Sequence, residues 1–205
     1  MSSRFPVPSA PHQYEFEIKR SRFLTVVERA VNREAAENVI RQQRQAHPQA
    51  AHVCWAYIAG SPDTTVRSMS DDGEPSGTAG RPMLKVLEHS GLGEIVVAVI
   101  RYYGGIKLGT GGLQRAYSDA VTGALKDLPT TQWVPRTAIT IEFDYPLESN
   151  VRHCLSQFDT DEPATDYANQ VSIHFAIADN QKTQCLQALT DLCAGAIQIG
   201  ELDQQ

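Results

Sequence analysis

The chain has 205 residues, a formal net charge of −6, 41% hydrophobic residues and 20% charged residues. This composition is typical of a globular protein and excludes an intrinsically disordered one. The longest strongly apolar run, residues 95–100, is far shorter than the roughly 20 residues of a membrane-spanning helix. The first residues lack the apolar stretch of a signal peptide and include Pro6, Pro8 and Pro11. We therefore expect a cytoplasmic protein that does not bind membranes.

The first 130 residues alternate between strand patterns and helix patterns. After a proline-rich, extended lead over residues 1–13, alternating apolar and β-branched residues predict strands over residues 14–19, 23–27, 52–58, 64–69 and 94–101. Helical spacing of apolar residues predicts a helix over 33–45, a short helix that begins near Pro82, and a longer helix after Gly112. The strand at 94–101 is the most apolar, so we expect it at the centre of a sheet.

Residues 131–205 differ from the first part in charge and in pattern. Residues 1–130 contain 15 Lys and Arg against 13 Asp and Glu, whereas residues 131–205 contain 3 against 11. Residues 128–131 predict a linker, and the order βαββαβ beyond it predicts a ferredoxin-like sandwich. We therefore expect two α+β domains, residues 1–130 and residues 131–205. The acidic second domain is poorly suited to a nucleic-acid backbone.

The four cysteines give no sign of a metal or redox site. Cys54, Cys154, Cys185 and Cys193 form no C-x-x-C pair, and none has a histidine at the spacing of a zinc site. Free cysteine packs like a small hydrophobic residue. We predict four reduced cysteines, with Cys54 buried on its strand, and neither a metal nor a cofactor.

Five glycines lie within nine positions directly before the longest predicted helix. Backbone N–H groups at a helix start attract anions, and glycine lets a partner approach the backbone closely. The spacing matches neither a P-loop nor a dinucleotide-binding motif, and glycines that serve only a tight turn explain it equally well. The candidate anion- or partner-binding residues are Lys107, Gly109, Thr110, Gly111, Gly112 and Arg115, with Arg81 and Arg101 as further cations.

Residues 70–80 are almost all turn formers and contain three carboxylates. Asp71, Asp72 and Glu74 could hold a divalent cation, but solvated turn residues that bond to their own backbone are the commoner case. The loop also lacks the downstream glutamate of an EF-hand, so no metal is predicted. With Ser76 and Thr78, these residues are ill-suited to a core. We therefore expect this loop to pack beside the glycine-rich loop and to form one polar face with it.

Three segments closely resemble the bacterial YigZ branch of the IMPACT family. They are KRSRF at 19–23, SDDGEPSGTAGRPM at 70–83 and RYYGGIKLGTGGL at 101–113. The resemblance covers residues 14–130 strongly. It implies the fold of the second domain of ribosomal protein S5 for the first domain. For the second domain it implies the ferredoxin-like fold of the last domain of elongation factor G.

The resemblance implies a link to translation but no chemistry. Eukaryotic members of the family regulate translation by binding the activator of an amino-acid-sensing kinase, and that pathway is absent from bacteria. No catalytic residues are established for the family, so none is assigned here. We expect a non-catalytic binding protein whose partner is the ribosome, RNA or a translation-associated protein, and no DNA partner.

Two other functions remain open from the sequence. The first is an enzyme acting on a phosphorylated small molecule or a peptide, which would use the glycine-rich loop for the anion and the acidic loop for a base or a metal. No nucleophile with a neighbouring base is visible, which argues against it. The second is a purely protein-binding adaptor that uses the acidic sheet of the second domain.

Overall fold

The structure, a computed structural model, describes residues 4–201, and these divide into two compact units. The N-terminal unit spans Phe5–Trp133, and the C-terminal unit contains the residues from Val134 onward together with Arg4. This arrangement confirms the predicted α+β class in two domains. The elements of the N-terminal unit are β1 (Phe5–Pro8), β2 (His12–Ile18), β3 (Ser21–Arg29), α1 (Arg33–Ala46), β4 (His52–Ile58), β5 (Arg67–Ser70), α2 (Gly80–Ser90), β6 (Ile95–Tyr102), α3 (Thr110–Lys126) and β7 (Thr130–Trp133).

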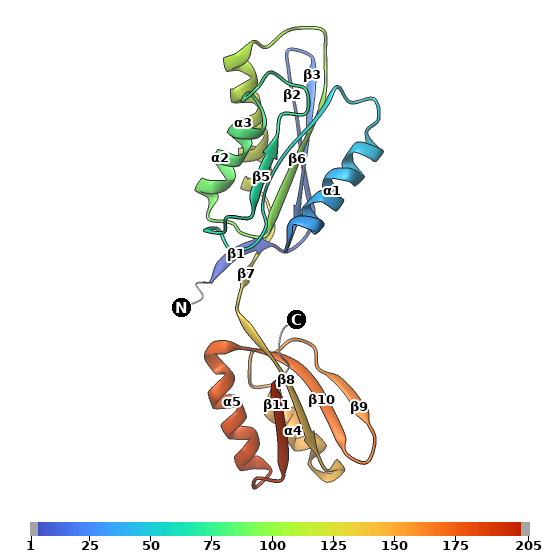
Figure 1. Ribbon diagram of the computed structural model, residues 1–205, viewed down its shortest axis with the longest axis vertical. Helices are drawn as coiled ribbons and strands as arrows, with labels where there is room; N and C mark the ends of the chain where they lie inside the picture. The colour runs from blue at the N-terminus through green and yellow to red at the C-terminus, as the bar shows by residue number, and fades with distance from the viewer. Residues whose placement is uncertain (1–3, 202–205) are drawn as a thin grey trace. The chain divides into compact units, whose positions relative to one another are not determined.

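The N-terminal unit is built on an antiparallel sheet of order β2-β3-β6-β4-β5. The most apolar strand, β6, lies at its centre as predicted, and every residue of β6 except Tyr102 is buried. Since β3 and β4 both run antiparallel to β6, they are parallel to each other, and α1 connects them. Helices α2 and α3 lie together on one face of the sheet, and α1 lies on the other (Figure 1).

Alternation along the strands supplies a core to each face of this sheet. Phe23, Cys54 and Val97 point toward α2 and α3, where they meet Leu87 and Tyr117. Neighbouring positions on the same strands point to the other face, which α1 covers in part. Each fully buried aliphatic side chain stabilises the fold by about 1.5–3 kcal/mol. The cores on the two faces together therefore stabilise the sheet that carries the loops.

The proline-rich lead and the predicted linker form a two-stranded sheet instead. β1 pairs antiparallel with β7, and Phe5 stacks on Trp133 with ring centroids 4.9 Å apart. Phe5 is 6% exposed, and its ring fits over Gly93, where a Cβ atom would lie 2.4 Å from it. Because β7 belongs to the N-terminal unit, the division falls after Trp133 and not after residue 130 as the linker had indicated.

The C-terminal unit has the predicted order of elements. They are β8 (Arg136–Phe143), the 3₁₀ turn η1 (Tyr145–Leu147), α4 (Glu148–Leu155), β9 (Ala164–Tyr167), β10 (Val171–Ala178), α5 (Asp179–Leu192) and β11 (Ile197–Glu201). The antiparallel order β11-β8-β10-β9 is that of a ferredoxin-like sandwich. Ile141, Phe143 and Ile173 pack against Val151 of α4 and Leu189 of α5.

The four cysteines all lie within the described residues. All four cysteines are free, Cys54 is fully buried, and Cys154 is the one that is partly exposed. No helix within residues 4–201 is long and apolar enough to cross a membrane.

Candidate functional site

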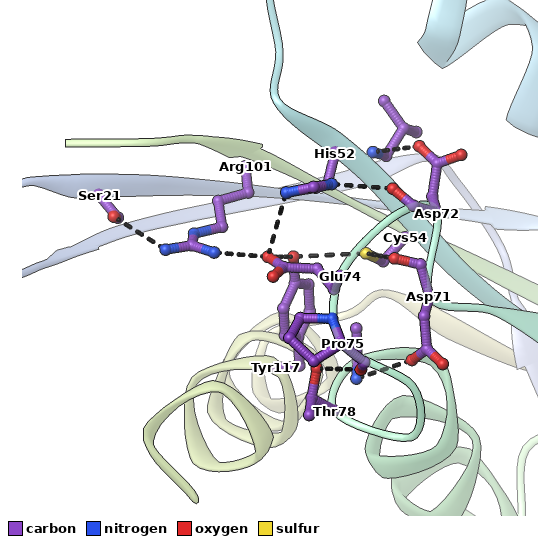
Figure 2. Close-up of polar contacts among 12 residues, drawn as sticks. Ser21, His52, Cys54, Asp71, Asp72, Glu74, Pro75, Thr78, Arg101 and Tyr117 are labelled. Atoms are coloured by element: carbon purple, nitrogen blue, oxygen red, sulfur yellow. Dashed lines mark hydrogen bonds and ion pairs between the residues drawn. The ribbon is translucent and has the colours of Figure 1, made fainter. Parts of the chain in front are cut away.

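A buried ion pair lies where the two predicted loops meet. Arg101, at the end of β6, donates from Nη1 to Glu74 Oε1 at 2.5 Å, and the side chains are 5% and 3% exposed (Figure 2). The Arg101 guanidinium lies between the rings of Phe23 and Tyr103, at 5.5 and 5.4 Å from their centroids. Its Nε atom is buried and makes no hydrogen bond with the described residues. The pair therefore ties the acidic loop to the central strand.

The same carboxylate accepts a second hydrogen bond from the helix beneath it. Tyr117 of α3 donates its hydroxyl to Glu74 Oε1 at 2.9 Å, and Cys54 Sγ lies 3.3 Å from that hydroxyl oxygen (Figure 2). Burial raises the pKa of Cys54 to about 12, because the hydrogen bond with Tyr117 offsets only part of it. Burial likewise raises the pKa of Tyr117 above its ordinary value. Both groups are therefore protonated structural donors at neutral pH and unsuited to nucleophilic attack.

The other two carboxylates of the acidic loop, those of Asp71 and Asp72, accept hydrogen bonds from backbone N–H groups. Asp71 accepts hydrogen bonds from the N–H groups of Gly77, Ala79 and Gly80, at 2.8–2.9 Å. Burial by itself raises the pKa of Asp71, but the three backbone donors outweigh it and the pKa is lowered. Asp72 accepts from the Val53 N–H and pairs with Arg44 of α1. The three carboxylates thus point to three different partners.

His52, at the start of β4, stands between these two loops. Its Nδ1 lies 2.8 Å from the carbonyl oxygen of Asp72, and its Nε2 lies 3.9 Å from Glu74 Oε1 (Figure 2). The side chain is 24% exposed, so its outer edge reaches solvent. Both ring nitrogens of His52 therefore have a polar neighbour in the acidic loop.

A cavity of about 490 Å³ opens over the ion pair. One side comes from His52, Glu74 and Pro75, and the other from the glycine-rich loop with Tyr103, Lys107, Leu108, Gly109 and Thr110. The Ser70–Arg81 and Tyr102–Gly112 segments therefore meet at this cavity. Gly109 precedes α3 with φ 73°, a conformation that favours glycine, and no side chain caps the helix. Because the first N–H groups of a helix have no acceptor within it, the start of α3 presents donors beside this cavity.

A third segment joins this face. The turn between β2 and β3 holds Lys19 and Arg20 in the left-handed region, with φ 47° and 64°. A Cβ atom at Gly104 would lie 1.9 Å from the Arg20 carbonyl oxygen, so only glycine fits against this turn. Ser21 Oγ then accepts from Gly104 N at 3.3 Å and from Arg101 Nη2 at 3.4 Å. The turn places two exposed cations next to the glycine-rich loop.

The structure separates the predicted site residues into three groups. Lys107, Gly109 and Thr110 line the cavity, with Glu74 and Arg101 in its floor. Ser76 and Arg81 line a different groove between α2 and α3. The remaining predicted residues line neither of these hollows, and they are Asp71, Asp72, Thr78, Gly111, Gly112 and Arg115.

Two of these predictions need correction. Arg101 was expected as a surface cation, but it is buried and its charge is neutralised by Glu74. Glu74 and Thr78 were expected among solvated turn residues, yet Glu74 is 8% exposed and Thr78 is fully buried, donating to Pro75 O at 2.6 Å. Arg101 and Glu74 are buried because each pairs with the other, although they lie far apart in the sequence. Thr78 is buried because the loop conformation brings its hydroxyl to the Pro75 carbonyl oxygen, three residues away.

No cluster of three His, Cys, Asp or Glu residues within positions 4–201 is arranged to hold a metal ion. Asp71, Asp72 and Glu74 are each committed to backbone or to arginine. The donors around the cavity are cations and N–H groups, which suit an anion and not a cation.

Sequence reasoning missed Lys19, Arg20 and His52 as parts of this face, and it included Tyr103 only as a member of the Tyr102–Gly112 segment. Lys19 and Arg20 are charged residues at a tight turn, and KRSRF carried part of the resemblance, which was the available signal. Tyr103 is 49% exposed and covers the Arg101 guanidinium. The face toward which Tyr103 points could not be assigned from the sequence, because it depends on the pairing of β6 with β3.

The comparison with known families decides which proteins are related to this one. The family described as "Impact N-terminal domain" matches residues 19–125, which contain all three motifs and the whole cavity. The chain belongs to the IMPACT family. The IMPACT-type domain is followed by a match to a domain of unknown function, DUF1949, over residues 141–196, within the ferredoxin-like unit.

Relatives from distant bacteria cover both domains. The IMPACT family member YigZ of Escherichia coli is 39% identical over 97% of this chain and 98% of its own length. The IMPACT family member YvyE of Bacillus subtilis is 33% identical over 98% of this chain and 92% of its own. A crystal structure described as that of a hypothetical protein covers the whole chain with 37% identity and a TM-score of 0.72. The expected membership of the YigZ branch is thereby confirmed.

Proposed function

We propose that this IMPACT family protein is a non-catalytic binding protein linked to translation, and that it holds a phosphate group of RNA on the N-terminal unit. The observation that carries the proposal is the cavity that combines the start of α3 with Lys107 and Thr110. Unpaired N–H groups, the positive end of the helix dipole and a nearby ammonium together favour an anion. Lys19 and Arg20 extend the same face, so a polyanion could follow it beyond one phosphate.

The groups around the cavity support binding over catalysis. The nearest thiol, Cys54, is buried and has a pKa raised to about 12. The Glu74 carboxylate, which lines the cavity, is engaged by Arg101 and Tyr117. The hydroxyl of Thr78, which lies outside the cavity in the same loop, donates to a backbone carbonyl. Exposed Tyr103 adds an aromatic surface of the kind on which a base stacks.

The test is a titration of fluorescein-labelled single-stranded RNA with the full-length protein at several salt concentrations. Lys107→Ala should weaken binding about three- to tenfold at low salt. It should also reduce the slope of log K against log salt concentration by about one, because one fewer counterion is released on binding. Lys126→Ala is the matched control, because Lys126 is an exposed lysine at the C-terminal end of α3, whereas Lys107 lies just before the N-terminal end of that helix. Inorganic phosphate should compete with the RNA.

Absence of any saturable, salt-dependent binding would contradict the proposal. The glycine-rich face would then be better explained as a contact surface for a translation-associated protein. Equal effects of Lys107→Ala and Lys126→Ala would mean that the RNA follows the net charge of the domain and not this cavity.

A further inference from the structure

A second hollow, larger than the first, runs between α2 and α3. Its volume is about 920 Å³, and the loop that lines the first cavity with Glu74 and Pro75 lines this one with Ser76 and Gly77. The two helices pack side by side on one face of the sheet (Figure 1). Residues of both helices line the groove. The resemblance and the proposed RNA site assign no role to it.

One wall of this groove is basic. Arg81, Lys85 and His89 line it from α2, and their spacing of four residues places them on one stripe of the helix. The single carboxylate of α2, Glu88, pairs with Arg67 of β5 at 3.0 Å. Arg81 and Lys85 therefore have no carboxylate on their own helix to neutralise them.

The opposite wall and the floor are uncharged. α3 contributes Ser118, Thr122 and Leu125, and Val86 of α2 adds an apolar surface beside Leu125. None of the twelve described residues that line the groove is acidic. The groove is therefore a positively charged and partly apolar surface of the N-terminal unit.

We propose that this groove binds an acidic amphipathic helix of a partner protein. Apolar residues on one face of such a helix would lie against Val86 and Leu125, while its carboxylates would meet Arg81 and Lys85. Complementary charge favours this occupant over a neutral or basic one. The uncharged α3 wall and the absence of an aromatic residue among the lining residues make it a poor groove for RNA, which gains from cations on both sides and from stacking.

The probe is a fluorescein-labelled peptide of leucine, alanine and glutamate, about four helical turns long, with leucines at helical spacing. Two control peptides replace every glutamate by lysine or every leucine by serine. Fluorescence anisotropy with the full-length protein should show saturable binding of the acidic peptide and of neither control peptide. Lys85→Glu should weaken that binding about tenfold, whereas Lys126→Glu, the same charge change on an exposed lysine outside the groove, should change it less than about twofold.

Ser118→Trp is a second variant that fills the groove without altering charge, and it should abolish peptide binding. Lys107→Ala should leave peptide binding unchanged, which separates this groove from the proposed RNA site. The proposal is overturned if the acidic peptide does not bind, if the lysine peptide binds equally, or if Lys85→Glu and Lys126→Glu have equal effects. RNA binding that depends on Lys85 but not on Lys107 would assign the groove to nucleic acid instead.

Discussion

Arg101 and Glu74 form a buried ion pair that joins the central strand to the acidic loop, with Nη1 and Oε1 2.5 Å apart. The two residues are 27 positions apart in the sequence, and each supplies the charge that makes burial of the other tolerable. The pair forms the floor of the proposed anion cavity. Its role there is to position the Glu74–Pro75 loop and Tyr103, which stacks on the guanidinium.

Removing one partner of this pair should destabilise the N-terminal unit strongly. We expect Arg101→Met to lower the free energy of unfolding in urea by about 3–5 kcal/mol, because it leaves Glu74 charged and buried. A double variant, Arg101→Met with Glu74→Leu, should recover much of that loss. Arg22→Met is the control, since Arg22 forms an exposed pair with Glu15 and its loss should barely shift the transition. A small effect of Arg101→Met would show that water reaches the pair.

Asp71 should make stability depend on pH in the acidic range. Its pKa is lowered in the folded protein, so the ionised carboxylate stabilises the fold above the unfolded pKa of about 4 and loses this effect as pH falls through the folded pKa. Asp71→Asn should cost about 1 kcal/mol at pH 7, because an amide replaces one of the accepting oxygens. The difference from wild type should shrink below about pH 4. A difference that stays constant with pH would rule out this role.

Phe5 should behave as a core residue although it lies in the proline-rich lead. It is 6% exposed, stacks on Trp133 and covers Gly93. Phe5→Ala should therefore lower the free energy of unfolding by about 3–5 kcal/mol. Val31, a hydrophobic residue that is 52% exposed, provides the comparison, and Val31→Ala should have little effect. Equal effects in chemical denaturation would mean that β1 does not pair with β7 in solution.

The cysteines should react with thiol reagents in a fixed order. Cys154 is partly exposed, whereas Cys54 and Cys185 are fully buried and burial raises the pKa of each to about 12. Under native conditions at pH 8 we expect Cys154 to be labelled first and Cys54 to react only after unfolding. Mass spectrometry of labelled peptides measures this directly. Rapid labelling of native Cys54 would contradict the burial of its thiol.

The sequence predicted the regular elements because their apolar spacing is local. The helix that begins at Thr110 carries Leu113, Ala116, Tyr117 and Ala120 on one face, and the structure buries all four. β1 and β7 were missed because each has four residues, two of the residues in β1 are proline, and their pairing joins positions more than 120 apart.

The site was only partly predictable for a related reason. The glycine pattern correctly indicated a loop that precedes a helix, and Gly109 and Gly104 have geometric roles that only glycine fulfils. The burial of Arg101 could not be inferred, because a charged residue at a strand end is ordinarily exposed and its partner lies in another loop. The approach of Arg20 to Gly104 likewise depends on the pairing of β3 with β6.

The most direct test of the anion site is substitution of Gly111, measured both by RNA binding and by stability. Gly111 does not line the cavity itself, but it follows the cavity-lining Thr110 in the first turn of α3. Apart from its chain neighbours and the backbone of its own helix, no heavy atom of the described residues lies within 4 Å of the position that a Cβ atom would take at Gly111, so the fold has room for a side chain there. Alanine and valine are also better helix formers than glycine. Gly111→Ala and Gly111→Val should therefore keep or raise the free energy of unfolding, while Gly111→Val weakens RNA binding at least about tenfold by blocking approach to the helix start. Unchanged RNA affinity of Gly111→Val in a protein of wild-type stability would contradict the proposed site.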